Sequence, residues 1–197
     1  MRHSGTLTPV DWIAAGFRAL TAGGPSALRV EAIARELGVS KGSFYWHFTD
    51  GPAFKRAMLR HWAEIATANV IGEVSEAGAD PREQLRCLVK IAAGSRSDPY
   101  GGKLVEAAIR DWARYDADAA GTLKTVDRQR LEFVKSLFAA CGIPTERVAA
   151  FAGILFGALI GLEQLHHHGL ANVNGDLTVL LELLLGGSAG LAPEDPS

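Results

Sequence analysis

The stretch GVSKGSFYWHF, residues 38–48, decides how the rest of the chain is read. A glycine, two serines and a lysine lead directly into a run of aromatic residues. A buried segment has no need of Lys41, and an ordinary solvated helix does not carry Tyr45, Trp46 and His47 in a row. The pattern therefore indicates a short segment with one buried face and one exposed face, and the exposed face is a candidate binding surface.

The residues on either side predict a helix, a tight turn and a second helix. Apolar residues recur every three or four positions over residues 29–37, which is the period of an amphipathic helix. Gly38 closes this helix, and Ser40 is expected to cap a shorter one that runs to about residue 47. Helix, glycine-containing turn and helix is the spacing of a helix-turn-helix.

The apolar residues of this unit predict a small core beneath the turn. The small side chain of Ala34 falls where the two helices would cross. A further helix, which begins at Thr8-Pro9 and ends at Gly23-Gly24, is expected to pack against both of them. Thr8 and Asp11 have the spacing of a capping box. The expected core residues are Ile13, Phe17, Ile33, Leu37, Val39, Phe44 and Phe48.

Burial of that core leaves one side of the second helix outside, and its chemistry suits the DNA major groove. A lysine can meet phosphate or guanine, glycine allows a close backbone approach, and hydroxyl, indole and imidazole groups are donors. The alternative is a helical corner whose aromatic residues pack on a neighbouring helix. The outward-facing residues are Lys41, Gly42, Ser43, Tyr45, Trp46 and His47.

The residues of the predicted helix-turn-helix also resemble a known protein family. VEAIARELGVSKGSFYWHFTDGPAF, residues 30–54, resembles the DNA-binding signature of the TetR family of bacterial transcriptional repressors. Residues 108–144 resemble, more loosely, one C-terminal subset of that family. The resemblance implies an Ω-shaped homodimer, with three N-terminal helices for operator DNA and a C-terminal helical domain for dimerisation and a ligand.

The resemblance also implies roles for single residues. Tyr45 and Trp46 would mainly hold phosphates, whereas Lys41, Ser43 and His47 are candidates for base edges. The implied DNA-binding set is Arg29, Lys41, Gly42, Ser43, Tyr45, Trp46, His47 and Lys55.

Two positions depart from the family pattern. Arg29 stands where the family often has a phosphate-binding Ser or Thr, and an arginine can make that contact more strongly. Gly51-Pro52 stands where a lysine commonly opens helix four. The backbone N–H groups of that helix start, with Lys55 one turn further on, are the expected substitutes.

Length and composition agree with a DNA-binding protein in a reducing cytoplasm. The chain has 197 residues, 48% hydrophobic and 21% charged, and its two cysteines form no CxxC pair. Residues 1–62 hold 8 basic and 4 acidic residues, and the rest holds 12 basic and 18 acidic. This asymmetry favours a polyanionic partner at the N-terminal end.

The remaining pattern predicts helices only, because no alternating run is long enough for a strand. We expect an all-α chain of about nine helices: a long fourth helix that opens at Thr49 or Asp50 and runs through residues 54–74, and later helices at 81–95, 102–114, 117–140, 145–168 and 176–186. The predicted division is a helix-turn-helix domain at 1–50, a ligand-binding and dimerisation domain at 51–187 and a disordered tail at 188–197. The longest apolar run, residues 148–162, is shorter than the roughly 20 residues of a membrane span and predicts a buried helix.

The helix at 145–168 carries Ala149, Gly153, Gly157 and Gly161 at intervals of four. This spacing forms a smooth stripe on one side, which favours close packing of another helix. A dimer interface formed with the apolar helix that follows is the preferred interpretation. The alternatives are packing inside one subunit, or room for a ligand.

Aromatic and apolar residues of the C-terminal helices are candidates for a cavity that holds a mainly apolar or planar small molecule. Core packing alone is the alternative for each of them. Arg110, Arg130 or Gln164 could supply a polar contact to the ligand. The predicted ligand-binding set is Met58, Trp62, Ile65, Ile109, Trp112, Phe133, Phe156 and Gln164.

No enzyme, metal or cofactor is expected. The run His166-His167-His168, with Glu163 three residues earlier, matches only one arm of a carboxylate di-iron site, and a solvated helix end is preferred. Glycine-rich phosphate loops and nucleophile motifs are missing from the sequence. The sequence thus predicts a ligand-responsive repressor on a palindromic operator. An activator, a regulator controlled by a partner protein, or a helical carrier of small molecules or metals remains the alternative.

Overall fold

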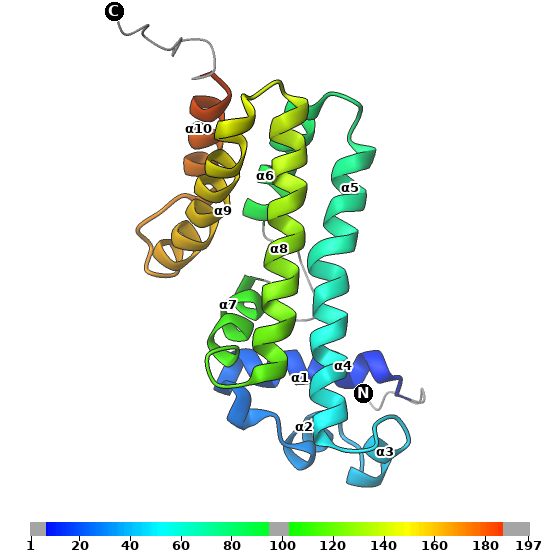
Figure 1. Cartoon of the computed structure of the whole chain (residues 1–197). Coiled ribbons are helices and arrows are strands. Elements are labelled where there is room, and N and C mark those ends of the chain that lie inside the picture. Colours follow the sequence, from blue (N-terminus) through cyan, green and yellow to red (C-terminus); the bar gives the residue numbers. More distant parts are fainter. Residues whose placement is uncertain (1–6, 95–102, 187–197) are drawn as a thin grey trace, which may run out of the picture. The chain divides into compact units, whose positions relative to one another are not determined.

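The computed structural model describes residues 7–94 and 103–186, and every regular element in these ranges is a helix. This confirms the all-α prediction. The helices are α1 (Pro9–Gly23), α2 (Val30–Glu36), α3 (Lys41–Tyr45), α4 (Gly51–Ala63), α5 (Val70–Glu76), α6 (Pro81–Ala93), α7 (Lys103–Trp112), α8 (Ala117–Ala140), α9 (Thr145–His167) and α10 (Val173–Gly186) (Figure 1).

The predicted long fourth helix is interrupted. A π-helical segment, Glu64–Asn69, joins α4 to α5, so the three form one continuous helical run. A π segment holds extra backbone per turn and occurs frequently at functional sites. Apolar periodicity could not reveal it, because a single wide turn disturbs the repeat too little. With this run counted once, the described residues contain the nine helices that the sequence predicts.

Local capping interactions fix where the first and fourth helices begin. The Asp11 carboxylate accepts from the Thr8 backbone N–H at 2.7 Å, and the Asp11 N–H donates to the Thr8 hydroxyl at 3.4 Å. The predicted capping box is therefore present. At the start of α4, the Asp50 carboxylate accepts from the Ala53 N–H at 2.6 Å. Each cap satisfies a backbone donor that the helix itself leaves free.

By packing, the described chain divides into two compact units. The first contains residues 7–66 and 103–126, and the second contains residues 67–94 and 127–186. The first unit therefore includes α4, α7 and the start of α8 as well as α1–α3. The predicted boundary at residue 50 is a division by function and stays a prediction. The predicted disordered tail, 188–197, lies outside the described residues.

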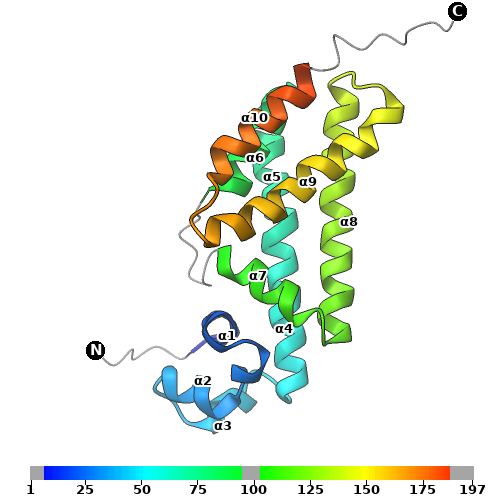
Figure 2. The ribbon, with the colours of Figure 1, turned by 90° about the vertical axis from the view of Figure 1, so that its left-hand side faces the viewer.

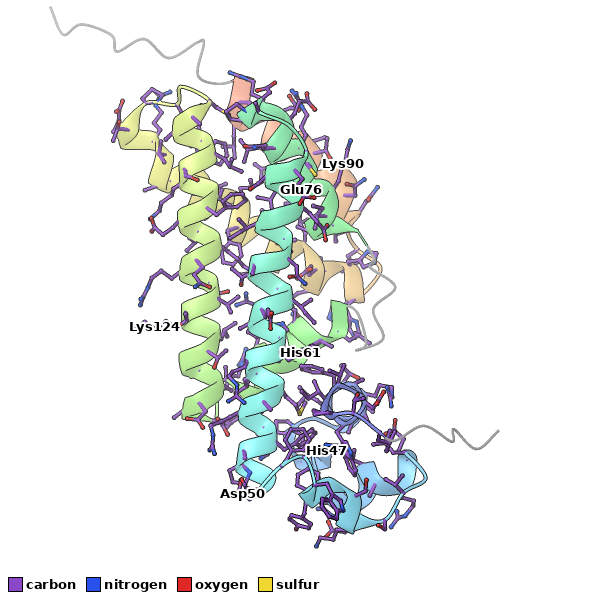
Figure 3. All side chains as sticks on the ribbon, turned by 90° about the vertical axis from the view of Figure 1, so that its right-hand side faces the viewer. His47, Asp50, His61, Glu76, Lys90 and Lys124 are labelled. Carbon is purple, nitrogen blue, oxygen red and sulfur yellow. The ribbon has the colours of Figure 1, made fainter. Side chains whose placement is uncertain are left out.

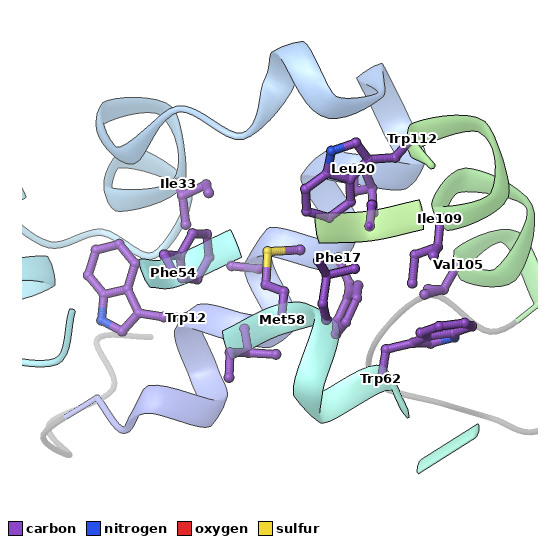
Figure 4. Packing of buried hydrophobic residues seen from close by; sticks show 14 of the residues in the cluster. Trp12, Phe17, Leu20, Ile33, Phe54, Met58, Trp62, Val105, Ile109 and Trp112 are labelled. Carbon is purple, nitrogen blue, oxygen red and sulfur yellow. The ribbon is translucent and has the colours of Figure 1, made fainter. Parts of the chain in front are cut away.

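The core of the first unit forms around α1 and confirms the small core that the sequence predicts (Figure 4). Ile33 of α2 and Phe44 of α3 are buried in the same cluster as Phe17 of α1. Gly16 lets α1 approach α4 closely, because a Cβ there would lie 2.7 Å from the Met58 sulfur. Buried residues from α7 complete the same core, so all of these helices share one apolar interior.

The second unit has its own core, formed by α5, α6, α9, α10 and the C-terminal part of α8. In Figures 1 and 2, α9 and α10 lie side by side, and they pack against each other. Arg86 on α6 donates to both carboxylate oxygens of Glu182 on α10, at 2.8 and 3.1 Å. This ion pair ties α10 to α6, and the hydrogen bonds to Glu182 and Glu83 raise the pKa of the Arg86 guanidinium.

Helix α9 differs from the buried helix that its apolar run predicts. Among its residues, Ala152 and Leu155 are buried, while Ile154 and Leu165 are about half exposed. Within the described residues it is long and apolar enough, by length and composition, to cross a membrane. One such helix is weak evidence for a membrane protein. The prediction of a buried helix is wrong for a single chain, because one side of α9 packs on its own unit and the other does not.

Phe44 is the residue whose loss should damage the first unit most directly. Truncation of this fully buried ring by Phe44→Ala should lower the free energy of unfolding by about 3–5 kcal/mol, measured by urea unfolding. The control is Trp46→Ala two residues later, where the side chain is 87% exposed and the change should stay within about 0.5 kcal/mol. Similar losses in both variants would contradict the assigned core.

Candidate nucleic-acid interface

The turn between α2 and α3 depends on Gly38. Its φ of +70° lies in the left-handed region, where residues with a side chain are strained. The Gly38 N–H donates to the Arg35 carbonyl at 3.2 Å, and the Val39 N–H donates to the Ala34 carbonyl at 3.0 Å. These bonds close α2 and redirect the chain within three residues. The predicted helix-turn-helix is therefore present.

Helix α3 is held on the unit by Phe44. Its ring has no exposed area and makes edge contacts with Trp12 at 5.3 Å and Phe54 at 5.5 Å between ring centroids. Because Phe44 points inward, its neighbours Tyr45 and Trp46 point outward, with 53% and 87% of their surfaces exposed. Large aromatic residues are rarely left in water without a partner, so this face suits an external ligand.

The predicted cap of α3 by the Ser40 side chain is wrong. Ser40 occupies the N-cap position, but its hydroxyl makes no capping hydrogen bond, and its backbone carbonyl accepts from the Ser43 N–H at 3.0 Å instead. The short helix is therefore stabilised by Phe44 packing rather than by a cap. The exposed Ser40 hydroxyl stands at the edge of the same face.

Lys41, on this exposed face, forms an ion pair that shifts its pKa. Its ammonium lies 2.6 Å from the Glu31 carboxylate on α2, and both side chains are more than half exposed. This hydrogen bond, with a smaller contribution from Tyr45, raises the pKa of Lys41, and the same contact lowers the pKa of Glu31. The sequence reasoning missed Glu31. Its signal was an acidic residue in the first turn of α2, beside the turn.

The other predicted DNA-binding residues of α2, α3 and the connection to α4 are exposed or half-buried. Arg29 is exposed at the N-cap of α2, and His47 lies half-buried in the connection from α3 to α4 (Figure 3). A Cβ on Gly42 would meet only the Ser40 hydroxyl, at 3.6 Å, so packing within the chain does not require a glycine there. Ser43 is half-buried on α3.

Lys55 is held differently from the exposed residues of α3. Its ammonium lies 5.8 Å from the centroid of the Trp112 ring on α7, within the range of a cation–π contact. The side chain is half-buried, so phosphate would have to compete with this ring. The contact joins a predicted DNA-binding residue to a predicted ligand-binding residue.

The start of α4 has fewer free N–H donors for a phosphate than the sequence suggests. Pro52 has no N–H, and the Ala53 N–H already donates to the Asp50 carboxylate. The Phe54 N–H donates to the Asp50 carbonyl at 3.1 Å. The Asp50 charge at this helix start also opposes an anion.

The predicted ligand-binding residues fall into both compact units. Met58, Trp62, Ile109 and Trp112 are buried in the first core. Ile65 is half-buried in the π segment. In the second unit, Phe133 packs against the core, Phe156 is half-buried on α9 and Gln164 is exposed on α9. Arg110, a candidate polar contact, donates to Glu106 at 2.8 Å.

The glycine stripe lies on the exposed side of α9. Ala149 and the three glycines are all exposed, and a Cβ at Gly153, Gly157 or Gly161 would meet nothing within 4 Å. On the neighbouring α10, Val179 and Leu183 are more than 60% exposed. The two helices therefore carry a smooth apolar surface that their own unit does not cover.

The histidine run at the end of α9 is exposed, and His166 Nδ1 lies 2.9 Å from the Ala171 carbonyl. The described residues contain no group of three potential metal ligands from histidine, cysteine, aspartate and glutamate. This contact with the backbone gives His166 a local role at the helix end.

Comparison with known proteins agrees with this geometry. Residues 13–50 match the family model described as bacterial regulatory proteins, tetR family. A transcriptional regulator from Rhodococcus sp. Rha1 superposes with a TM-score of 0.75 at 19% identity, over 94% of this chain and 100% of that chain. A TetR-family transcriptional regulator from Agrobacterium tumefaciens gives 0.74 at 19%, over 88% and 95%.

A third structure, from Saccharomonospora viridis, is a complex with choline. It superposes with a TM-score of 0.75 at 17% identity, over 89% of this chain and 94% of that chain. A search of the curated proteins found no match.

The fold and its exposed α3 are those of a helix-turn-helix unit. The match over residues 13–50 confirms the resemblance of this part of the chain to the TetR family, and the fold is that of the transcriptional regulators compared above.

The left-handed turn gives a direct test of the interface geometry. Gly38→Ala should lower the free energy of unfolding by about 1 kcal/mol, because φ of +70° strains a side chain although a Cβ there meets nothing within 4 Å. Affinity for DNA should fall with it, as measured by unfolding and duplex titration. The control Gly121→Ala, in the interior of α8, should instead stabilise by about 0.5–1 kcal/mol. A stabilised Gly38→Ala would contradict the turn.

Proposed function

We propose that the chain is a homodimeric, cytoplasmic repressor of a palindromic operator, and that a small molecule releases it. The observation that carries the DNA-binding part is the exposed face of α3. Trp46 is 87% exposed beside the fully buried Phe44, on a helix set at the surface by a glycine turn. In a dimer, two such helices would enter successive major grooves about one helical turn apart or somewhat more.

The roles on this face follow from the chemistry of each side chain. Tyr45 and Trp46 present a hydroxyl and an indole N–H at the rim of α3, which suits phosphate oxygens. Lys41, Ser43 and His47 stand on or beside the same helix with donors for base edges, and guanine O6 and N7 are the acceptors that a lysine reads best. Arg29 and Lys55 are the proposed phosphate contacts outside α3.

The dimer part of the proposal rests on the uncovered surface of α9 and α10. Glycines at every fourth position let a second backbone approach closely, and each glycine in a helix interior costs about 1 kcal/mol relative to alanine. That cost is offset if a partner helix packs there. Within one chain, Arg86 of α6 pairs with Glu182 of α10 and restrains α10, which reduces the ordering that association requires.

The effector part of the proposal is a small, mainly apolar or planar molecule, bound by the helices of the predicted ligand-binding domain. It must bind the released state better than the DNA-binding state by about 1–3 kcal/mol. Choline in the Saccharomonospora viridis structure supports a small-molecule effector for this fold. Buried tryptophans are suited to flat or cationic ligands, because their faces attract both.

An activator is the second candidate for the same DNA contact. It would bind the same palindrome, and its footprint would lie upstream of the promoter instead of overlapping it. A helical small-molecule carrier predicts no salt-dependent DNA binding at all.

The exposed indole provides the first test of the DNA contact. Trp46→Ala should weaken binding to every duplex by about tenfold, because a phosphate hydrogen bond is lost. Lys41→Ala and His47→Ala should in addition blur the sequence preference. Tyr115→Ala is the matched control, since Tyr115 is 83% exposed on the α7–α8 connection and should leave titrations unchanged. Unchanged affinity in all three α3 variants would remove this helix from its role.

The glycine stripe provides the test of the dimer. Gly157→Glu should convert the protein to monomers in sedimentation, because it places charge in the centre of the proposed interface. Its own chain tolerates the side chain, since a Cβ there meets nothing within 4 Å. Gly121→Glu is the control, because that glycine on α8 is equally exposed and open. A dimeric Gly157→Glu protein would contradict the stripe as the interface.

A further inference from the structure

The ion pair between Glu31 and Lys41 places a carboxylate on a face that otherwise attracts phosphate. Glu31 lies in the first turn of α2, Lys41 lies in the first turn of α3, and 2.6 Å separates their charged atoms. Both side chains are more than half exposed, so burial does not force them together. A carboxylate at this point repels the phosphates of the DNA backbone and lowers the affinity for DNA. Its presence therefore needs an explanation other than a gain in DNA affinity.

We propose that Glu31 is a specificity-determining residue that positions Lys41, so that the pair reads a G·C base pair in the major groove. This inference rests on the proposed DNA-binding function. An isolated lysine is a point charge on a flexible stem and binds any phosphate within reach. Glu31 restrains that stem and neutralises its charge, which lowers the attraction to phosphates on every sequence.

The donor and acceptor pattern of the pair matches one base pair. The Lys41 ammonium has three donors, of which Glu31 takes one, and the others remain for O6 and N7 of guanine. The second carboxylate oxygen of Glu31 can accept from the N4 amino group of cytosine. In an A·T pair the adenine amino donor stands in place of guanine O6, and the thymine O4 acceptor stands in place of the cytosine amino group, so neither Lys41 nor Glu31 finds its full set of partners.

The arrangement around the pair keeps it in place. Gly38 fixes the approach of α3 to α2, and Phe44 anchors α3, so the distance between the two stems is set by the turn. Tyr45 contributes to the same cluster, since it favours the charged form of Lys41. Arg29 stands two residues before Glu31, is exposed, and its charge makes a minor contribution to the lowered pKa of Glu31.

The test compares Glu31→Gln with Glu36→Gln. Both residues lie on α2, and each makes an exposed ion pair, Glu36 with Arg18 of α1 at 2.7 Å. Both variants therefore remove one negative charge from the same helix, but only the first frees Lys41. Operators selected with the unaltered protein and scrambled duplexes are then titrated over a range of salt concentrations.

Glu31→Gln should bind scrambled duplexes several-fold more tightly and lower the ratio of operator to scrambled affinity by about tenfold. The slope of log affinity against log salt should steepen by about 1, because one more phosphate is neutralised. Selection with this variant should lose a G·C preference at one position of each half-site. Glu36→Gln should change none of these quantities.

A double substitution separates positioning from simple charge. In a Lys41→Gln background, Glu31→Gln should no longer alter the salt slope, because Glu31 acts through Lys41. If Glu31→Gln behaves like Glu36→Gln, or if its effect survives in that background, the inference is overturned while the proposed function stands. If the unaltered protein prefers no duplex, the proposed function fails first, and the inference fails with it.

Discussion

Burial of Phe44 is the interaction on which the DNA-binding unit depends. This ring inserts between Trp12 and Phe54 and has no exposed surface, so α3 cannot rotate about its axis. The side chains on the opposite face of α3 are therefore exposed because the buried Phe44 ring fixes the orientation of the helix. A five-residue helix without a side-chain cap has little stability of its own, and tertiary packing supplies what the local sequence does not.

Much of this unit could be predicted from the sequence, because its signals are local. Gly38 at a positive φ, the capping box of Thr8 and Asp11 and the apolar spacing around Ile33 each act within a few residues. The Glu31–Lys41 pair was not predicted: an acidic residue at the start of α2 is visible in the sequence, but the contact itself joins residues ten apart across a turn. The placement of Lys55 over Trp112 was also out of reach, because α7 is distant in sequence.

The second unit shows where pattern reasoning fails. The apolar composition of α9 predicts burial, yet its glycine stripe remains open, because hydrophobicity alone cannot tell a core from an interface. The π segment after Ala63 also left no periodic signal. An uncovered apolar surface on one unit and an exposed, polar aromatic helix on the other are both accounted for if two chains associate and place two α3 helices on one duplex.

Selection of bound duplexes from a random pool at physiological salt, followed by sedimentation of the selected complex, tests this account most directly. The account predicts a palindromic motif occupied by two chains, with half-sites about one helical turn apart or somewhat more. Enrichment of no sequence over bulk DNA, or a motif occupied by a single chain without symmetry, would contradict it.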